Sequence, residues 1–290
     1  MTADPGPAAT PASGHAVQRR RTIDFSDLAP RIVSAVVMVA AAVGTAFSGG
    51  LPFAILWWLA ALAIHWEWQR LIGSGRDPVR LVFGALAIAL AAIASPYDSG
   101  AWSLLLLVAG AIATGWSGRS LRGASGFGVI YAGLLPLALG LLRGSETRGL
   151  EAVLWLFAVV WGTDIMAYFG GRLIGGPKLW RRVSPSKTWS GFLIGIGSGA
   201  VAGLAVAFAW GAGWMLVPLG LVAGMVAQGG DLFESVLKRR FGVKDSSGLI
   251  PGHGGVMDRL DGFLTAAVFA ACFGLLRFGL GQAAAGLMQW

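Results

Sequence analysis

Long apolar stretches with almost no charge dominate this sequence. Of its 290 residues, 56% are hydrophobic and only 12% are charged, about half of the ~25% that is typical of a soluble domain. So few charged side chains cannot cover the surface of a water-soluble globule, and the high hydrophobicity excludes a disordered chain. A lipid bilayer is therefore the expected solvent for most of the molecule.

Nine segments are apolar enough to be membrane helices, each of which needs ~20 mostly apolar residues. We therefore expect an all-α polytopic integral membrane protein with about nine transmembrane helices. Glycine is frequent in these segments, and small residues let helix backbones approach closely in lipid. The expected spans are residues 32–48, 51–66, 81–95, 101–116, 127–142, 150–170, 191–211, 213–230 and 262–280.

Basic residues are distributed unevenly between the two sides that these spans define. Nineteen of the 22 Lys and Arg residues lie in the N-terminal arm or in loops on the same side as the arm, and two lie in loops on the other side. Because cytoplasmic loops carry the excess of Lys and Arg, we expect the N-terminus in the cytosol. A signal peptide after the arginines at 19–21 is the alternative to a first membrane anchor.

The spans and the distribution of charge divide the chain into three parts. Residues 1–28 are rich in Pro, Ala and Gly, and we expect a disordered cytosolic arm. Residues 29–149 are predicted to form an N-terminal transmembrane scaffold of about five helices. Residues 150–290 are predicted to form a catalytic transmembrane region of about four helices. The single cysteine excludes an internal disulfide and any multi-cysteine metal site.

Charge is concentrated between residues 161 and 261, which hold all four lysines of the protein. Lysine is a compact point charge that suits phosphate, so this region is a candidate phosphate site. Asp164 lies inside a predicted span, where an ionisable residue is by default a functional hypothesis. The alternative is that Asp164 reaches the cytosolic interface and pairs with Arg172.

The segment 184–191 (SPSKTWSG) places three hydroxyl groups around Lys187 just before a predicted helix. Free N–H groups and the helix dipole make a helix N-terminus suitable for binding a phosphate. The alternative is ordinary helix capping by Ser or Thr. The hydroxyl residues are Ser184, Ser186 and Thr188.

The third cluster, residues 228–261, carries acids on two predicted helices that a glycine-containing loop joins. Asp231, Ser235 and Lys238 share one helical face through their i, i+4, i+7 spacing. Asp258 and Asp261 lie at the start of the last span. Carboxylates bind Mg²⁺ through one or two oxygens while substrate phosphates complete the shell, which favours a divalent-metal and triphosphate site over a solvated loop with ion pairs.

The loop 251–255 (PGHGG) adds backbone N–H groups that glycine lets approach an anion closely. Gly254 and Gly255 are the candidate glycines, and Lys244 and Arg259 lie nearby in the sequence. His253 has three possible roles at this point: a base, a phosphate donor or a structural loop residue.

These residues resemble the signature of the phosphatidate cytidylyltransferases, or CDP-diacylglycerol synthases. Segments 164–171 and 184–191 are also similar to that family, although Ser190 stands where many members have Glu and Gly262 where relatives often have Ser. In chain order, the residues of the signature are Ser235, Lys238, Arg239, Lys244, Asp245, Pro251, His253, Gly254, Gly255, Asp258, Arg259 and Asp261.

The resemblance implies transfer of the CMP moiety of CTP to phosphatidate, giving CDP-diacylglycerol and pyrophosphate in phospholipid biosynthesis. It also implies Mg²⁺, with a second cation left open. Asp231, Asp258 and Asp261 are the expected metal ligands, and Ser235 and Lys238 are further catalytic candidates. The expected substrate-binding residues are Asp164, Ser184, Ser186, Lys187, Thr188, Lys244, Asp245, His253, Gly254, Gly255 and Arg259.

We further expect the bacterial inner membrane as the location and an active site that faces the cytosol, where CTP and a membrane lipid can meet. No nucleic-acid partner is expected, and a homodimer is left open. The hydroxyls near Lys187 are not assigned to CTP or to phosphatidate. The alternative functions are a related lipid enzyme, such as a polyprenol kinase or an archaeal-type lipid cytidylyltransferase, and a transporter or channel whose acids line an ion path.

Overall fold

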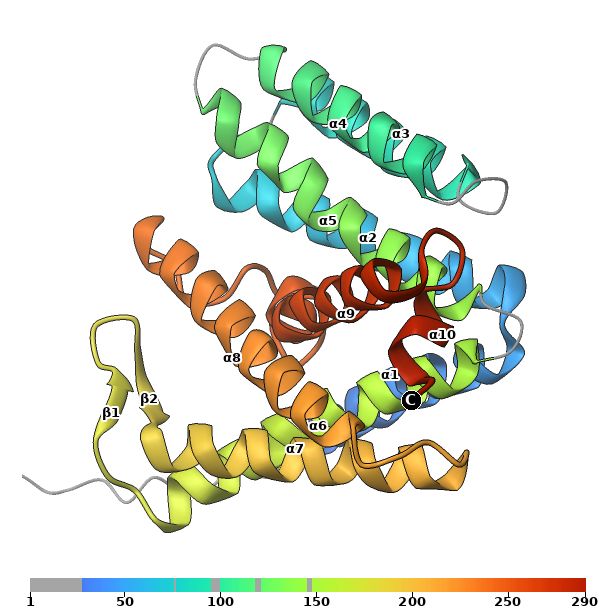
Figure 1. Cartoon of the computed structure of the whole chain (residues 1–290). Coiled ribbons are helices and arrows are strands. Elements are labelled where there is room, and N and C mark those ends of the chain that lie inside the picture. The colour runs from blue at the N-terminus through green and yellow to red at the C-terminus, as the bar shows by residue number, and fades with distance from the viewer. Residues whose placement is uncertain (1–27, 76, 95–99, 118–120, 145–147) are drawn as a thin grey trace, which may run out of the picture.

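The computed structural model describes residues 28–290 except 76, 95–99, 118–120 and 145–147 (Figure 1). The expected disordered arm lies outside the described residues, apart from residue 28, which begins the first helix. Among the described residues the elements are α1 (Leu28–Ser48), α2 (Gly50–Leu71), α3 (Pro78–Ala94), α4 (Ala101–Trp116), α5 (Arg122–Arg143), α6 (Gly149–Leu173), β1 (Lys178–Trp180), β2 (Ser184–Thr188), α7 (Trp189–Ala209), α8 (Leu216–Arg240), α9 (Met257–Phe278) and α10 (Ala283–Met288).

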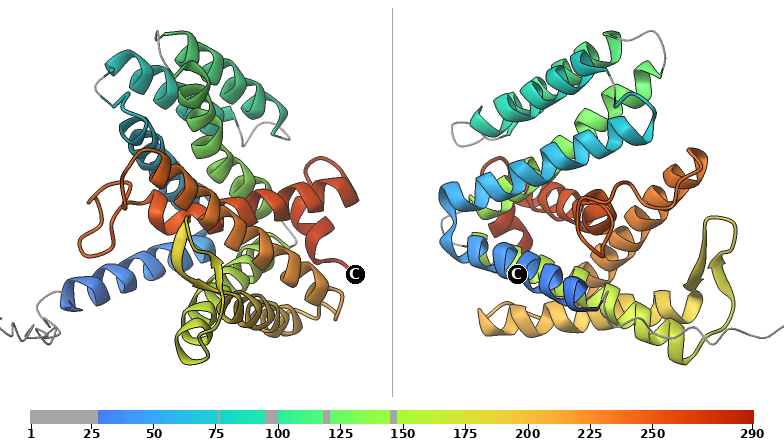
Figure 2. Two further views of the ribbon diagram at one scale, coloured as in Figure 1. Left: turned by 90° about the vertical axis from the view of Figure 1, so that its left-hand side faces the viewer. Right: turned by 180° about the vertical axis from the view of Figure 1, so that it is seen from behind.

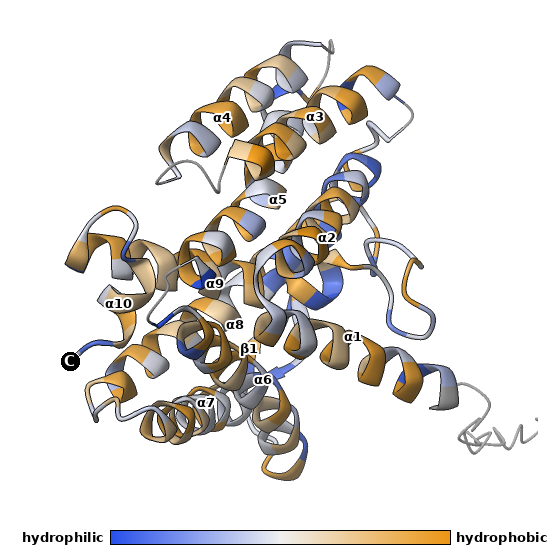
Figure 3. Ribbon diagram, turned by 90° about the vertical axis from the view of Figure 1, so that its right-hand side faces the viewer, coloured by the Kyte–Doolittle hydropathy of each residue, from blue (hydrophilic) through white to orange (hydrophobic). Residues whose placement is uncertain are grey.

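Each of the nine predicted spans corresponds to a helix, from α1 to α9. Seven of the described helices are long and apolar enough to cross a membrane, whereas α3 and α4 have 17 and 16 residues. The prediction of a helical polytopic membrane protein is confirmed, and the count of nine crossings stays a prediction. Many large apolar side chains on the helices are exposed, and hydrophobic residues dominate the helical ribbons (Figure 3), as expected where lipid is the solvent.

Two features at the ends of the helices differ from the prediction. Helix α8 continues ten residues beyond the expected end of its span, and its last turn carries Lys238, Arg239 and Arg240, which complement the negative end of the helix dipole. Helix α10 was not predicted. It folds back on α9, where Arg277 donates to the carbonyls of Gly286 and Gln289.

A short antiparallel hairpin interrupts the otherwise helical architecture, and sequence periodicity did not predict it. Strand β1 pairs with β2, and the chain turns between Trp180 and Val183. The hairpin follows α6 after Gly175, Gly176 and Pro177, residues that stop a helix. It leads directly into α7 and projects beyond the ends of the neighbouring helices (Figure 1).

The helices are arranged around α9, which contacts α8, α5, α10, α6 and α2. Helices α3 and α4 pack on each other and on α5, at one side of the molecule (Figures 1 and 2). The α6–α7 pair lies at the opposite side, and α8 runs between it and α9. The hairpin, the end of α8 and the start of α9 therefore belong to one region of the fold.

Helices α6 and α7 pack closely because glycines face α6 along one side of α7. A Cβ on Gly195 would lie 2.7 Å from the carbonyl oxygen of Thr163 and 2.8 Å from Cβ of Ala167. Gly197, two residues later, has open space around its position. The predicted role of small residues in close helix approach is thus confirmed for this pair.

We expect Gly195→Ala to destabilise the protein by about 1–3 kcal/mol, because the added methyl group overpacks the α6–α7 contact. Gly197→Ala is the matched control and should be close to neutral. Unfolding of both purified variants in detergent, followed by circular dichroism, measures the difference. Equal stabilities of the two variants would contradict the close contact.

Candidate active site

The site is built where α8 crosses α9, at two glycines that allow the helix backbones to meet. A Cβ on Gly230 would lie 2.7 Å from the carbonyl oxygen of Asp261, and one on Gly262 would lie 2.7 Å from that of Ala227. The crossing therefore brings the acids that flank these glycines together. Asp231 follows Gly230, and Asp261 precedes Gly262.

Lys238 joins the two helices as a buried cation between two carboxylates. Its Nζ donates to Oε2 of Glu234 (3.1 Å) on the same helix and to Oδ1 of Asp258 (2.7 Å) on α9. The side chains of the three residues are 14%, 2% and 5% exposed, respectively. Buried charges need partners and hydrogen bonds, and here the lysine neutralises acids from both helices.

Asp258 also holds the loop between α8 and α9. Its Oδ2 accepts from the backbone N–H of Gly255 (2.8 Å) and from both the backbone N–H and the hydroxyl of Ser246 (3.0 Å each). Together with the contact to Lys238, these bonds engage both carboxylate oxygens. As a metal ligand, which stays a prediction, Asp258 would have to exchange some of these partners.

The loop 251–255 forms a tight turn and not an open anion-binding loop. The N–H of His253 donates to the carbonyl of Ile250 (3.0 Å), and Gly252 adopts φ 74°, as the third residue of a type II turn requires. Nδ1 of His253 lies 2.7 Å from the hydroxyl oxygen of Ser34 on α1. Arg259 donates to the carbonyl of His253. These contacts favour the structural role among the three that the sequence left open.

Lys187 of the hairpin reaches α8. Its Nζ lies 2.5 Å from Oδ2 of Asp231 and 3.3 Å from Oε1 of Gln228. The hydroxyl of Ser235 donates to the other oxygen of Asp231 (3.4 Å), as the shared helical face predicted. A basic residue and an acid from two separate sequence motifs thus meet in one place.

The hydroxyls around Lys187 have different positions. Thr188 is buried and caps α7, because its Oγ1 accepts from the N–H of Gly191 (3.2 Å). The capping alternative is therefore correct for Thr188. Ser186 is exposed and Ser184 is half-buried, both on β2. Ser190 bonds the carbonyl of Gly175 and thereby ties α7 to the end of α6.

Asp164 on α6 lies near enough to the cluster to feel its charges, and it does not pair with Arg172. Arg172 instead donates to the hydroxyl of Tyr168 (2.7 Å). The charges of Asp231 and Asp261 act on Asp164, as do those of two basic residues of the site. The location of Asp164 supports the functional hypothesis over the interfacial ion pair.

Three carboxyl groups lie at this crossing and a fourth, on α6, lies near it; their ion pairs within the described residues come from two lysines. Oε1 of Glu234 is buried without a hydrogen-bond partner among the described residues, and the carboxyls of Glu234 and Asp261 are near enough to interact, an arrangement that needs a proton or a cation between the two groups. The four acids are Asp164, Asp231, Glu234 and Asp261.

No three His, Cys, Asp or Glu side chains within the described ranges converge closely enough to hold a metal ion by themselves. Mg²⁺ typically uses one or two carboxylates and takes its other ligands from water and substrate phosphates. The excess of acid at the crossing therefore fits a cation that is bound together with a phosphate substrate.

Two predicted residues lie apart from the cluster, and one that contacts the loop was not predicted. Lys244 and Asp245 are exposed in the loop, and their side chains form no ion pair within the described part of the chain. Glu67 on α2 is fully buried and accepts hydrogen bonds from the loop and from the start of α9. The only sequence feature that could have drawn attention to Glu67 was an acid placed one residue beyond the expected span 51–66.

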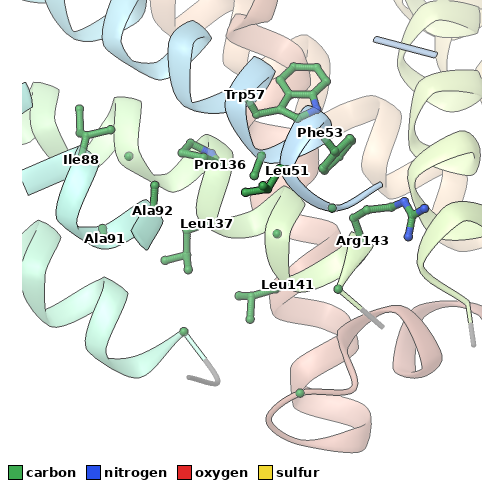
Figure 4. A pocket seen from close by; sticks show the side chains of 17 residues that line it. Leu51, Phe53, Trp57, Ile88, Ala91, Ala92, Pro136, Leu137, Leu141 and Arg143 are labelled. Atoms are coloured by element: carbon green, nitrogen blue, oxygen red, sulfur yellow. The ribbon is translucent and has the colours of Figure 1, made fainter. Parts of the chain in front are cut away.

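A hollow of about 470 Å³ lies elsewhere, between α2, α3 and α5 (Figure 4). It is lined by apolar side chains such as Phe53, Trp57 and Ile88, with Arg143 at its edge. The lining contains no acid and uses the N-terminal half of α2, whereas Glu67 lies in the C-terminal half. This hollow is thus separate from the carboxylate cluster.

The chain is similar to known proteins over nearly all of its length. Residues 29–276 match the sequence profile of the Cytidylyltransferase family. A phosphatidate cytidylyltransferase of Brucella abortus is 42% identical over 258 residues, which cover 87% of this chain and 95% of that protein. A phosphatidate cytidylyltransferase of Staphylococcus epidermidis is 38% identical over 190 residues, which cover 61% of this chain and 73% of that protein.

We expect Lys238→Met to lower the free energy of unfolding by about 3–5 kcal/mol, because it leaves two buried carboxylates without their cation. Arg240→Met is the matched control, since Arg240 is exposed at the end of the same helix. Unfolding of both variants in detergent measures the effect. A Lys238→Met variant as stable as Arg240→Met would show that the lysine does not compensate the two acids.

Proposed function

The chain belongs to the Cytidylyltransferase family, and from this we propose that it transfers the CMP moiety of CTP to phosphatidate, forming CDP-diacylglycerol and pyrophosphate. The observation that carries the proposal is the convergence of Asp231, Asp261 and Lys187 at the α8–α9 crossing. These residues come from segments that lie within the match to the phosphatidate cytidylyltransferases.

The reaction requires the approach of three anionic groups. A phosphate oxygen of phosphatidate attacks the α-phosphorus of CTP, a new P–O bond forms, and the bond to the β-phosphate breaks with release of pyrophosphate. No covalent enzyme intermediate is needed, so catalysis depends on positioning and on neutralising charge. The basic residues of the site can supply that neutralisation.

We assign Lys187 and Arg259 to substrate phosphates. Arg259 is exposed and Lys187 is partly exposed, and Lys187 needs only to exchange its contact with Asp231 for one with a phosphate. Lys238 lies deeper, and its partners Glu234 and Asp258 hold it in place. Its role is to fix α8 against α9 and to add positive charge near the reacting groups.

A divalent cation, which we propose to be Mg²⁺, fits beside Asp231 and Asp261, with Asp164 as an alternative to one of them and substrate phosphates completing the shell. When bound, it would neutralise charge on the phosphates of CTP and on the departing pyrophosphate. The carboxyl groups lie near one another and few basic side chains pair with them, and both observations support a cation at this point.

The location follows from the distribution of charge. The hairpin and the α8–α9 loop belong to the alternate set of loops that carries nearly all basic loop residues, and loops of that kind face the cytosol in membrane proteins. We therefore propose that the protein resides in a bacterial cytoplasmic membrane with its site facing the cytosol. CTP would enter from water, and phosphatidate from the adjoining leaflet.

We expect Asp231→Asn to lower the rate of CDP-diacylglycerol formation about a hundredfold or more, because a charge that the transition state needs is lost. The ion pair of Asp231 is partly exposed, so its loss should cost little stability. Glu151→Gln, which breaks a comparable ion pair with Arg148 at the start of α6, is the matched control. Turnover of Asp231→Asn close to that of the control would refute the assignment.

Removal of divalent cations with EDTA should abolish turnover, and added Mg²⁺ should restore it, because the acid cluster needs a cation when the phosphates are bound. The measurement is pyrophosphate release by the purified protein at several Mg²⁺ concentrations. Undiminished activity in EDTA would exclude the proposed cofactor while leaving the CTP-dependent reaction itself intact.

A further inference from the structure

Glu67 is a buried acid on the scaffold helix α2 that contacts the loop of the candidate site. Its side chain is fully buried, with 0% exposure. Oε1 accepts from the hydroxyl of Ser247 (2.5 Å) and from the N–H of Val256 (2.9 Å), and Oε2 accepts from the N–H of Met257 (2.6 Å). Its partners lie 180–190 positions from Glu67 in the sequence.

These contacts place a negative charge at the first turn of α9. Free N–H groups and the helix dipole favour an anion there, and hydrogen bonds to a charged acceptor are the stronger kind. None of the salt bridges within the described residues involves Glu67. The loop and the helix end are therefore the groups that stabilise its charge.

The geometry around Glu67 is crowded, which fixes the loop relative to α2. A Cβ on Gly255 would lie 2.5 Å from Oε1 of Glu67 and would also collide with the hydroxyl of Ser246. Gly255 donates to Asp258, and Asp258 in turn holds Lys238. Glu67 and Asp258 thus bind neighbouring residues in the same short stretches of the loop.

We propose that Glu67 is a positioning residue for the cytidylyl-transfer reaction, a role that rests on the function proposed above. It sets the start of α9 and the α8–α9 loop so that Asp261 and Arg259 face the substrate phosphates. The N-terminal half of the chain then contributes to catalysis through this contact, in addition to serving as a membrane scaffold.

The role needs a carboxylate and not merely a side chain of this size. Glu67 accepts three hydrogen bonds and donates none. A glutamine has one oxygen to accept bonds, and its NH₂ group would face an N–H or O–H donor of the loop. Glu67→Gln therefore keeps the volume but leaves donors at the α9 start without a partner, which is costly in a buried place.

The test compares Glu67→Gln and Ser247→Ala with Gln69→Leu. Gln69 is buried on the same helix, but its Nε2 donates to the carbonyl of Ser125 on α5, away from the loop. Rates are measured per folded molecule, with CTP varied at saturating phosphatidate. We expect Glu67→Gln to lower kcat/KM for CTP by about tenfold or more and Ser247→Ala by a few-fold, with Gln69→Leu unchanged.

A second readout does not depend on activity. Lys244 is exposed in the loop, so tryptic cleavage after Lys244 reports how firmly the loop is held. We expect faster cleavage in Glu67→Gln than in wild type and in Gln69→Leu. Equal cleavage and equal kcat/KM in Glu67→Gln and wild type would overturn the positioning role.

The outcomes keep this inference separate from the proposed function. An inactive wild-type protein with CTP and phosphatidate overturns the proposed function, whereas wild-type loop cleavage together with wild-type kcat/KM in Glu67→Gln overturns the inference. Should Glu67→Gln not fold, Ser247→Ala decides, because it removes a single hydrogen bond. Wild-type kcat/KM and cleavage in Ser247→Ala would then overturn the inference, and a loss in kcat/KM with faster cleavage would support it.

Discussion

The buried contact of Lys238 with Glu234 and Asp258 is the interaction on which the rest of the site depends. A cation between two acids within a largely apolar bundle is costly to separate, so α8 and α9 are held in one rotation and one register relative to each other. The glycines at 230 and 262 let the helices meet closely enough for that contact. With the crossing fixed, Asp231 and Asp261 are adjacent, and the loop between the helices is held at both ends.

Other parts of the chain add to this crossing from different directions. The hairpin brings Lys187 to Asp231, α6 presents Asp164 to the same acids, and α2 holds the loop through Glu67. The site is therefore assembled from segments spread over most of the sequence. A bilayer favours such an arrangement, because charges that would be costly in lipid can be gathered at one end of a helical bundle.

Patterns with a local physical cause were readable from the sequence. Apolar length predicted the helices, and the i, i+4, i+7 spacing placed Asp231 and Ser235 on one face, as their hydrogen bond confirms. Thr188 could be recognised as a cap, although a phosphate site was the alternative for its hydroxyl. The metal ligands and the substrate contacts stay predictions.

Features that depend on tertiary packing were not readable. The hairpin at 178–188 carries no periodic signal long enough to distinguish it from a loop. Sequence spacing did not decide the surroundings of Asp164: Arg172 lies about two turns further along α6 and binds Tyr168 instead. Glu67 meets its partners across nearly 190 residues, a contact that follows from how α2 packs beside α9 and from no local pattern.

The most direct test of the account follows the fate of two phosphorus atoms of CTP. Purified protein is incubated with phosphatidate, Mg²⁺ and CTP that is labelled either at the α- or at the γ-phosphate. Cytidylyl transfer predicts α-label in the lipid product and γ-label in released pyrophosphate, in equal amounts. Label from the γ-phosphate in the lipid, or no labelled lipid from folded wild-type protein, would contradict the account.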